Sequence, residues 1–239
     1  MQESEFSFEL DGTDLPFEPG QSIMEAATQA GVYIPHLCHH PDLRRNGSCK
    51  LCTVKVNGRF GSACALPAQA GCTVESNTSE LQEMRRQIVQ MLFVEGNHYC
   101  PFCEKSGNCQ LQVVAYHVGM VDMHFPPFNT ARQLDASHRE MLLDRDRCIQ
   151  CARCVRASQD LDKKNIFGLA GRGMNIRLVV NSDSGLLGDT DFSSADHAAQ
   201  VCPTGALIRK DQAYPCPIGS RLYDTPISQH TIRQDARHD

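Results

Sequence analysis

The stretch CKLCTVKVNGRFGSAC, at residues 49–64, places three cysteines around a predicted β-hairpin. Asn57 and Gly58 form the Asn-Gly pair that is typical of a two-residue type I′ turn between antiparallel strands. One more cysteine lies upstream, so a long loop, a close pair and a lone fourth thiol make up a first group of ligands. Zinc sites favour two compact CxxC pairs, so this spacing favours a [2Fe–2S] cluster. The first group consists of Cys38, Cys49, Cys52 and Cys64.

The residues around this hairpin predict a small α+β unit. Ser22 and Glu25 form a capping box that begins a helix, and Gly31 ends it. Alternating or β-branched segments predict further short strands at residues 5–10, 32–35 and 72–76. We expect these strands to pack on one helix, in a unit that spans residues 1–78.

Composition narrows the class of protein. The chain has 239 residues, 13 cysteines and a formal net charge of −5. Its first residues show no basic segment followed by an apolar one, and no run reaches about 18 apolar residues. We therefore expect neither a secretory signal nor a membrane span, and reduced, metal-bound cysteines in the cytoplasm. The mild acidity argues against a nucleic-acid partner, which would need a basic surface.

A CxxCxxC run further along the chain predicts a different kind of cluster. In CIQCARC, at residues 148–154, three thiolates can cover three corners of a cubane. The fourth thiolate is distant and precedes Pro203, as in bacterial ferredoxins. No second CxxCxxC run precedes it, so we expect one [4Fe–4S] cluster in a unit spanning 138–215, after a linker at 124–137. This third group consists of Cys148, Cys151, Cys154 and Cys202.

A middle segment, FVEGNHYCPFCEKSGNCQLQ at residues 93–112, contains only three cysteines. Histidine replaces cysteine as an iron ligand in Rieske centres, so His98, just ahead of the cysteines, is predicted as the fourth ligand. We expect a [4Fe–4S] site here, as the middle relay between the other two groups. This second group consists of His98, Cys100, Cys103 and Cys109.

Helices are predicted on both sides of the second group, in a unit spanning 79–123. The first begins at Ser79 and ends at Gly96, and another covers residues 110–119. Apolar residues at helical spacing predict that the first helix buries one face as core. These residues are Leu81, Met84, Ile88, Met91 and Leu92.

Two cysteines remain outside the three groups. We interpret Cys72 and Cys216 as small buried apolar residues, although either could in principle complete the second group from another unit. Weaker candidates for that fourth ligand are His39, His40 and His117. Residues 216–239 are expected to form a C-terminal tail.

Together, these motifs resemble a known family. The signatures VYIPHLCHHPDLRRNGSCKLCTVKVNG, FVEGNHYCPFCEKSGNCQLQ and DRDRCIQCARCVR, with the tail AYPCPIGSRLYD, are similar to the small diaphorase subunit of NAD-reducing, bidirectional [NiFe]-hydrogenases. The same order of motifs resembles the N-terminal part of the large peripheral iron–sulfur subunit of respiratory complex I and the accessory region of iron-only hydrogenases. In those two the pattern is H-x3-C-x2-C-x5-C, whereas here Gly96 occupies the matching position and His98 lies two residues nearer. The resemblance covers nearly the whole chain, so we expect a stand-alone subunit.

The resemblance implies a β-grasp [2Fe–2S] ferredoxin-like domain, a small helical His/Cys3 [4Fe–4S] segment and a ferredoxin-like [4Fe–4S] domain. It implies an electron-transfer subunit that relays single electrons through one [2Fe–2S] and two [4Fe–4S] clusters, without catalytic residues of its own. The implied partners are a flavin- and NAD-binding diaphorase large subunit, on which the β-grasp domain would dock, and the small and large subunits of a [NiFe]-hydrogenase. The ferredoxin-like domain would face the hydrogenase small subunit.

Two alternatives stay open at this point. One is the equivalent iron–sulfur subunit of an NAD-dependent formate dehydrogenase or of a complex I relative, which only the partners would distinguish. The other is a zinc-binding scaffold or nucleic-acid adaptor, against which the acidic charge and the CxxCxxC run both argue.

Overall fold

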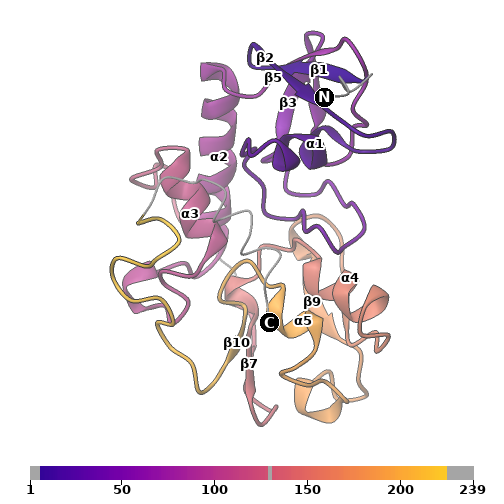
Figure 1. Ribbon diagram of the computed structural model, residues 1–239. Coiled ribbons are helices and arrows are strands. Elements are labelled where there is room, and N and C mark those ends of the chain that lie inside the picture. Colours follow the sequence, from indigo (N-terminus) through magenta and orange to yellow (C-terminus); the bar gives the residue numbers. More distant parts are fainter. Residues whose placement is uncertain (1–5, 129–130, 225–239) are drawn as a thin grey trace.

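The computed structural model describes residues 6–128 and 131–224 of the chain. Figure 1 shows a sheet near the N-terminus at the top, helix α2 beside it, and the strands of the C-terminal half at the bottom. Each of these regions has its own cluster of buried apolar side chains. The molecule is therefore a mixed α+β structure built on three small cores.

The N-terminal region is a five-stranded sheet covered by one helix. Its strand order is β2-β1-β5-β3-β4, in which β1 and β5 run parallel and the other neighbours run antiparallel. Helix α1 (Ile23–Gln29) supplies four buried residues to the core beneath the sheet. This is the expected β-grasp arrangement. The strands are β1 (Ser7–Leu10), β2 (Thr13–Pro16), β3 (Thr53–Val56), β4 (Arg59–Ser62) and β5 (Thr73–Glu75).

Two short-range predictions for this region, the Asn-Gly turn and the capping box, are confirmed. Asn57 and Gly58 have φ angles of 48° and 79°, as a type I′ turn requires. The Ser22 hydroxyl accepts from the Glu25 amide at 3.2 Å, and the Glu25 carboxylate accepts from the Ser22 amide at 2.7 Å. Both halves of the predicted capping box are thus present.

The predicted strand at residues 32–35 is wrong. Pro35 has no amide hydrogen for a ladder, and the carbonyl of Ile34 hydrogen-bonds with Nδ1 of His36 at 2.8 Å. The segment instead leads directly into the loop that carries Cys38. Ile34 is buried in the core of the sheet as a loop residue, and Val32 packs half-buried against that core.

The middle region consists of helices α2 (Ser79–Glu95) and α3 (Gln110–His117), joined through the short 3-10 helix η1 (Cys100–Phe102). The predicted apolar face of α2 is partly wrong, because Met91 is 42% exposed whereas Arg85 is only 1% exposed. The Arg85 guanidinium donates to the carbonyls of Leu51, Thr53 and Ser76, which a sequence pattern cannot anticipate. Helix α2 is therefore joined to the N-terminal sheet by a buried cation.

The C-terminal region combines a three-stranded sheet, a hairpin and two helices. The sheet order is β10-β7-β6, and β8 pairs with β9. Strand β6 lies within the predicted linker 124–137, so that linker is shorter than expected. The elements are β6 (Leu134–Asp135), β7 (Met141–Asp144), η2 (Arg145–Arg147), α4 (Arg153–Asp160), β8 (Phe167–Ala170), η3 (Gly173–Asn175), β9 (Arg177–Val180), η4 (Leu187–Asp189), α5 (His197–Gln200) and β10 (Leu207–Arg209).

The last described segment returns to the middle region, where Figure 1 shows it in yellow beside α3. The amide of Tyr214 donates to the Glu104 carbonyl at 2.8 Å, and the amide of Leu222 donates to the Gly107 carbonyl at 2.9 Å. The rings of Tyr116 and Tyr223 lie 4.7 Å apart. This segment, residues 214–224, is called the strap below.

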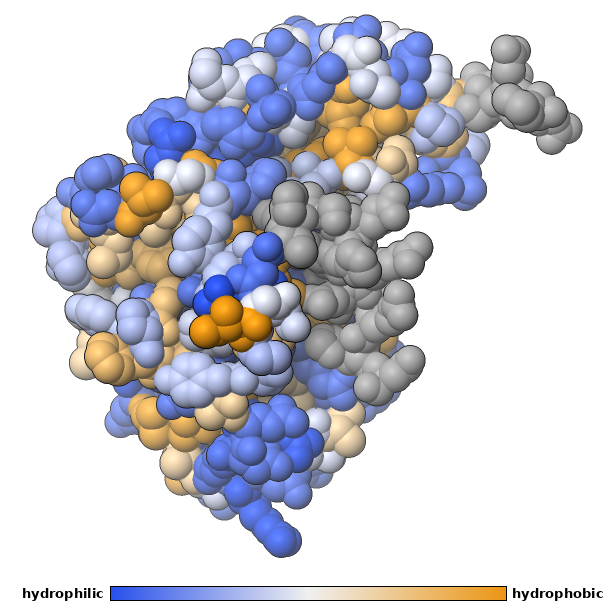
Figure 2. All heavy atoms as spheres, turned by 60° about the vertical axis from the view of Figure 1, so that its left-hand side comes forward, coloured by the Kyte–Doolittle hydropathy of each residue, from blue (hydrophilic) through white to orange (hydrophobic). Residues whose placement is uncertain are grey.

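The surface of the molecule is mixed in character. In the face shown in Figure 2, apolar side chains form separate patches among hydrophilic ones. Among the described residues, no helix combines the length and hydrophobicity that a membrane span would need.

The N-terminus of α2 provides a test of the local structure. The hydroxyl of Thr78, and not that of Ser79, accepts from the Leu81 amide, at 3.3 Å. Thr78→Ala should therefore cost about 1 kcal/mol in the free energy of opening the first turn of α2, measured by amide hydrogen exchange. Ser79→Ala is the matched control and should leave that exchange almost unchanged. Equal effects of the two substitutions would contradict this assignment of the cap.

Candidate metal centres

The first group of cysteines is assembled at one end of the N-terminal sheet. Cys38, Cys52 and Cys64 are buried, and Cys49 is half-buried. The sulfur atoms of Cys52 and Cys64 lie 3.3 Å apart and share a hydrogen bond, which lowers the pKa of Cys52 to about 7 and raises that of Cys64. Hydrogen bonds with the thiols of Cys49 and Cys64 hold the pKa of Cys38 far below its usual value. The structure thus brings all four predicted side chains together.

The loop that carries Cys38 and Cys49, residues 37–51, contacts the cores of the other two regions. Leu37 and Leu51 pack into the helical core of the middle region, whereas Leu43 packs into the C-terminal core. Gly47 has a φ angle of 68°, a left-handed conformation that glycine adopts without strain. The position of the Cys38 thiol therefore depends on residues far from it in the sequence.

The third group lines an apolar cavity in the C-terminal region. Gln150 and Ala152 alternate with the cysteines at φ angles of 55° and 56°, which curl the backbone of CIQCARC. Apolar residues of β8, β9 and β10 close the cavity. Its lining includes all four predicted thiols, Cys148, Cys151, Cys154 and Cys202.

Burial gives these thiols a marked preference for a positively charged ligand. It raises the pKa of Cys148 to about 12 and that of Cys151 to about 11. A thiolate isolated here would be costly, whereas a thiolate bound to metal has its charge compensated. The donor set and its apolar surroundings therefore fit a buried iron–sulfur cluster.

The second group lies on η1 and on the turn that leads to α3. Burial raises the pKa of the Cys109 thiol to about 12. The Cys109 sulfur donates to the carbonyl of Pro203, the residue after Cys202, at 3.7 Å. A Cβ atom added at Gly205 would lie 3.3 Å from the Cys103 sulfur. The second and third groups are thus packed against each other.

His98 precedes these cysteines in the chain and, within the described residues, has a ring nitrogen without a partner. Its Nε2 atom is buried and has no hydrogen-bond partner. Burial, followed by the charges of Arg147 and Arg132, lowers the pKa of His98 to about 4, so the imidazole is neutral. A Cβ atom added at Gly96 would lie only 2.7 Å from His98 Nε2. The His98 ring therefore occupies the space into which a side chain at position 96 would extend.

Among residues 6–128 and 131–224, no group of three or more His, Cys, Asp or Glu side chains has the arrangement that would hold a single metal ion.

The remaining cysteines differ from each other. Cys72 is buried in the N-terminal core, as predicted. Cys216 is only half-buried, so the prediction of a buried residue is wrong for it. It lies in the strap, with its carbonyl oxygen 3.3 Å from a Cβ atom added at Gly107.

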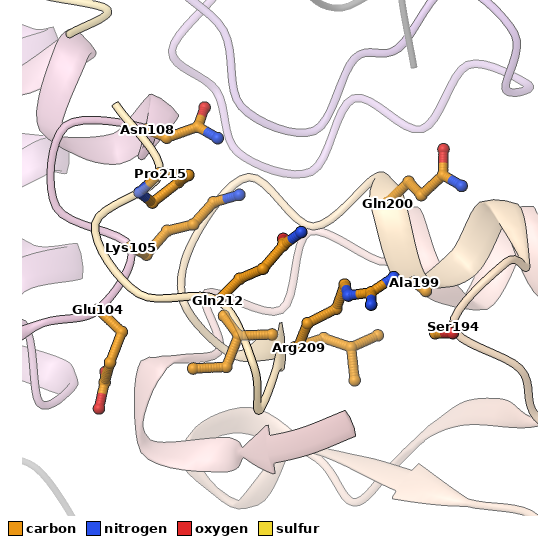
Figure 3. Close-up of a pocket in the computed structure, with 11 residues that line it drawn as sticks. Glu104, Lys105, Asn108, Ser194, Ala199, Gln200, Arg209, Gln212 and Pro215 are labelled. Atoms are coloured by element: carbon orange, nitrogen blue, oxygen red, sulfur yellow. The ribbon is translucent and has the colours of Figure 1, made fainter. Parts of the chain in front are cut away.

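A polar cavity lies where the turn of the second group, the strap and β10 meet (Figure 3). Figure 3 shows Lys105 of the turn, Pro215 of the strap and Arg209 of β10 around it. No cysteine or histidine is among the residues that line it. This cavity is therefore not a further candidate for a cluster.

Buried arginines are the functional residues that the motifs did not reveal. Arg153 and Arg156, on α4, are 1% and 3% exposed. Arg153 donates to the carbonyl of His39, and Arg156 donates to those of Cys38 and Cys151. A basic residue on a short helix is ordinarily exposed, so the sequence does not predict their burial. Their one distinguishing feature in the sequence is that they lie in and just after the CxxCxxC run.

Comparison with known protein families gives three matches along the chain. Residues 3–79 match a 2Fe-2S iron-sulfur cluster binding domain. Residues 85–124 match the NADH-ubiquinone oxidoreductase-G iron-sulfur binding region, and residues 141–208 match a 4Fe-4S single cluster domain.

A relative with a very similar length is the gamma subunit of the NAD-reducing hydrogenase HoxS of Cupriavidus necator. It is 40% identical over 216 residues, which cover 90% of this chain and 92% of the relative. The chain belongs to the HoxS gamma family. Its α+β fold with iron–sulfur binding domains is therefore shared with that component of an oxidoreductase.

Solved structures agree with membership of the HoxS gamma family. A chain in the crystal structure of NAD+-reducing [NiFe]-hydrogenase in the H2-reduced state has a TM-score of 0.88 and 50% identity, with 92% of this chain and 94% of that chain covered. More distant is the mitochondrial NADH-ubiquinone oxidoreductase 78 kDa subunit of Candida albicans, which is 30% identical over 215 residues. That match covers 88% of this chain but only 29% of the 78 kDa relative.

Gly96 offers a direct test of the geometry around His98. An added Cβ atom would also lie 2.5 Å from the Asp146 carbonyl, which accepts from the Asn97 amide at 2.9 Å. Gly96→Ala should therefore destabilise the protein by about 1–3 kcal/mol and speed exchange of the Asn97 amide. Gly168→Ala is the control, because its Cβ atom would meet nothing closer than 3.4 Å. An unchanged Asn97 exchange rate in Gly96→Ala would show that this space is open.

Proposed function

We propose that this chain is the electron-transfer subunit of an NAD-reducing hydrogenase. It relays single electrons between an FMN- and NAD(H)-binding diaphorase subunit and a [NiFe]-hydrogenase module. The observation that carries the proposal is that one chain of the HoxS gamma family contains three separate sets of buried or half-buried thiols. Its match to the 78 kDa relative covers less than a third of that protein's length, so we favour the hydrogenase assembly.

The proposed cofactors are one [2Fe–2S] cluster and two [4Fe–4S] clusters. Bound clusters supply the redox chemistry, while the protein positions them and sets the electrostatics. We assign the [2Fe–2S] cluster to Cys38, Cys49, Cys52 and Cys64. The two [4Fe–4S] clusters are assigned to His98, Cys100, Cys103 and Cys109, and to Cys148, Cys151, Cys154 and Cys202.

The assignment of His98 is supported by its electrostatics. A metal ligand must be a neutral imidazole with a free lone pair. Burial keeps His98 neutral, and its Nε2 atom has no hydrogen-bond partner. Gly96 leaves room for the ring at the position from which the histidine of the complex I pattern would extend.

The proposed route differs from the order of the groups in the sequence. Arg156 Nη2 donates to Cys38 in the first group and to Cys151 in the third. The Cys109 sulfur of the second group donates to Pro203, next to the third group. Since the third group contacts both others through these hydrogen bonds, we replace the expected middle position of the second group with the order first, third, second.

The proposed units and partners follow the same arrangement. We propose that residues 1–78 dock on the diaphorase large subunit. Because the second group ends the route, we propose that residues 79–123 face the hydrogenase small subunit, in place of the expected residues 138–215. Residues 79–123 hold the second group, and residues 216–239 form the tail. In this proposal the chain binds no substrate, performs no bond-making chemistry and functions in the cytoplasm.

Metal analysis tests the proposal. Protein prepared without oxygen should contain about ten iron atoms per chain, with a similar amount of acid-labile sulfide. An iron content of about six atoms per chain would mean that one of the [4Fe–4S] sites is empty. A content of zinc with negligible sulfide would refute the electron-transfer function.

Substitution of His98 tests its role as a ligand. His98→Cys should keep a [4Fe–4S] signal in electron paramagnetic resonance spectra but lower its reduction potential, because a thiolate adds negative charge to the cluster. His98→Ala should weaken or remove that signal. His117→Ala, on the exposed end of α3, is the control and should leave the spectra unchanged. If both His98 variants behave as the parent does, the fourth ligand lies elsewhere.

A further inference from the structure

Arg156 lies buried at the contact between the first and third groups. Its side chain extends from α4 and is only 3% exposed. Nη2 donates to the Cys38 carbonyl at 2.5 Å and to the Cys151 carbonyl at 3.4 Å. Nε donates to the Ala152 carbonyl at 3.1 Å, and Nη1 donates to that of Arg44. One guanidinium therefore holds the backbone of a predicted ligand from each of two clusters.

Among the described residues, this cation has no carboxylate partner. All four acceptors of Arg156 are carbonyl oxygens, and the ion pairs among the described residues do not include it. By contrast, Arg147, near the second group, pairs with Glu104 at 2.6 Å and with Asp144 at 2.9 Å. The positive charge of Arg147 is thus compensated by acidic side chains, whereas that of Arg156 is not.

A buried guanidinium stays protonated and is costly unless negative charge lies near it. Burial, together with the charges of Arg153 and Arg44, lowers the pKa of Arg156, and negative charge on Cys151 and Cys38 opposes that shift. Iron–sulfur clusters with four thiolate ligands carry a net negative charge in their own right. The two cysteine groups beside Arg156 therefore provide the charge that the surrounding protein does not.

We propose that Arg156 is an electrostatic bridge between the first and third clusters, which raises the reduction potentials of both and fixes their ligand loops relative to each other. The inference rests on the proposed function, since it assigns clusters to both groups. Reduction by one electron adds a negative charge to the cluster that receives it. A fixed positive charge in a medium of low dielectric constant stabilises that reduced form. Arg156 is thus a positioning residue whose positive charge stabilises the reduced form of either cluster.

The test uses redox titrations of the complete complex, followed by electron paramagnetic resonance of each cluster. Arg156→Gln removes the charge but retains a hydrogen-bond donor. At a fixed potential, the ratio of reduced to oxidised form should fall about tenfold for both clusters, which corresponds to about 59 mV for a one-electron couple. Arg156→Lys retains the charge but lacks the planar guanidinium group, and both ratios should stay within about threefold of the parent.

Arg85→Gln provides the matched control. Arg85 is also buried and donates to the carbonyls of Leu51 and Thr53, on either side of Cys52. In the part of the chain that the structure describes, the acceptors of Arg85 all lie in the first unit and none belongs to the third group. Arg85→Gln should therefore lower the potential of the [2Fe–2S] cluster alone.

Several outcomes would contradict the proposed effect of Arg156 on both clusters. Unchanged potentials in Arg156→Gln would mean that its charge does not act on the clusters, and a shift of only one cluster would mean that it does not link them. If Arg156→Gln loses a cluster, Arg156→Lys decides the question, since a tenfold change there would show that geometry rather than charge matters. Failure of the proposed function is distinct, because the parent complex would then lack the two cluster signals altogether.

Discussion

Hydrogen bonds from buried arginines to backbone carbonyls hold the ligand loop of the first group in place. Residues 37–51 form no strand or helix, so their peptide groups need partners from elsewhere. Arg85 of α2 supplies them on one side and Arg156 of α4 on the other. Because a guanidinium offers five donors in a rigid plane, one side chain can hold several carbonyls at once. The shape of this loop therefore depends on both of the other regions.

Local features were accessible from the sequence because they act over a few residues. The Asn57–Gly58 turn, the capping box at Ser22 and the helix at 110–117 depend on neighbours in the chain. The spacing of the cysteines likewise reflects how a short backbone segment can wrap around a cluster. Those signals predicted a small α+β unit at residues 1–78 and the groups of thiols that the structure brings together, whereas the β-grasp fold was implied by the family resemblance.

Features that depend on distant contacts were not accessible in the same way. Met91 faces solvent and Arg85 faces the core because the acceptors of Arg85 lie on another unit. Strand β6 forms only because β7 is available as a partner, although its own sequence is that of a linker. The spatial order of the cysteine groups has no local signature either, since it is determined by packing between regions.

The strap has a consequence for the timing of synthesis. Residues 214–224 are translated after every other described element, and their amides bind the carbonyls of Glu104 and Gly107 beside the second group. The N-terminal parts of a chain fold while later parts are still being made. The turn between Cys103 and Cys109 therefore stays uncovered until the strap emerges from the ribosome. During that interval, the carbonyls of Glu104 and Gly107 lack the amide partners that the finished protein provides.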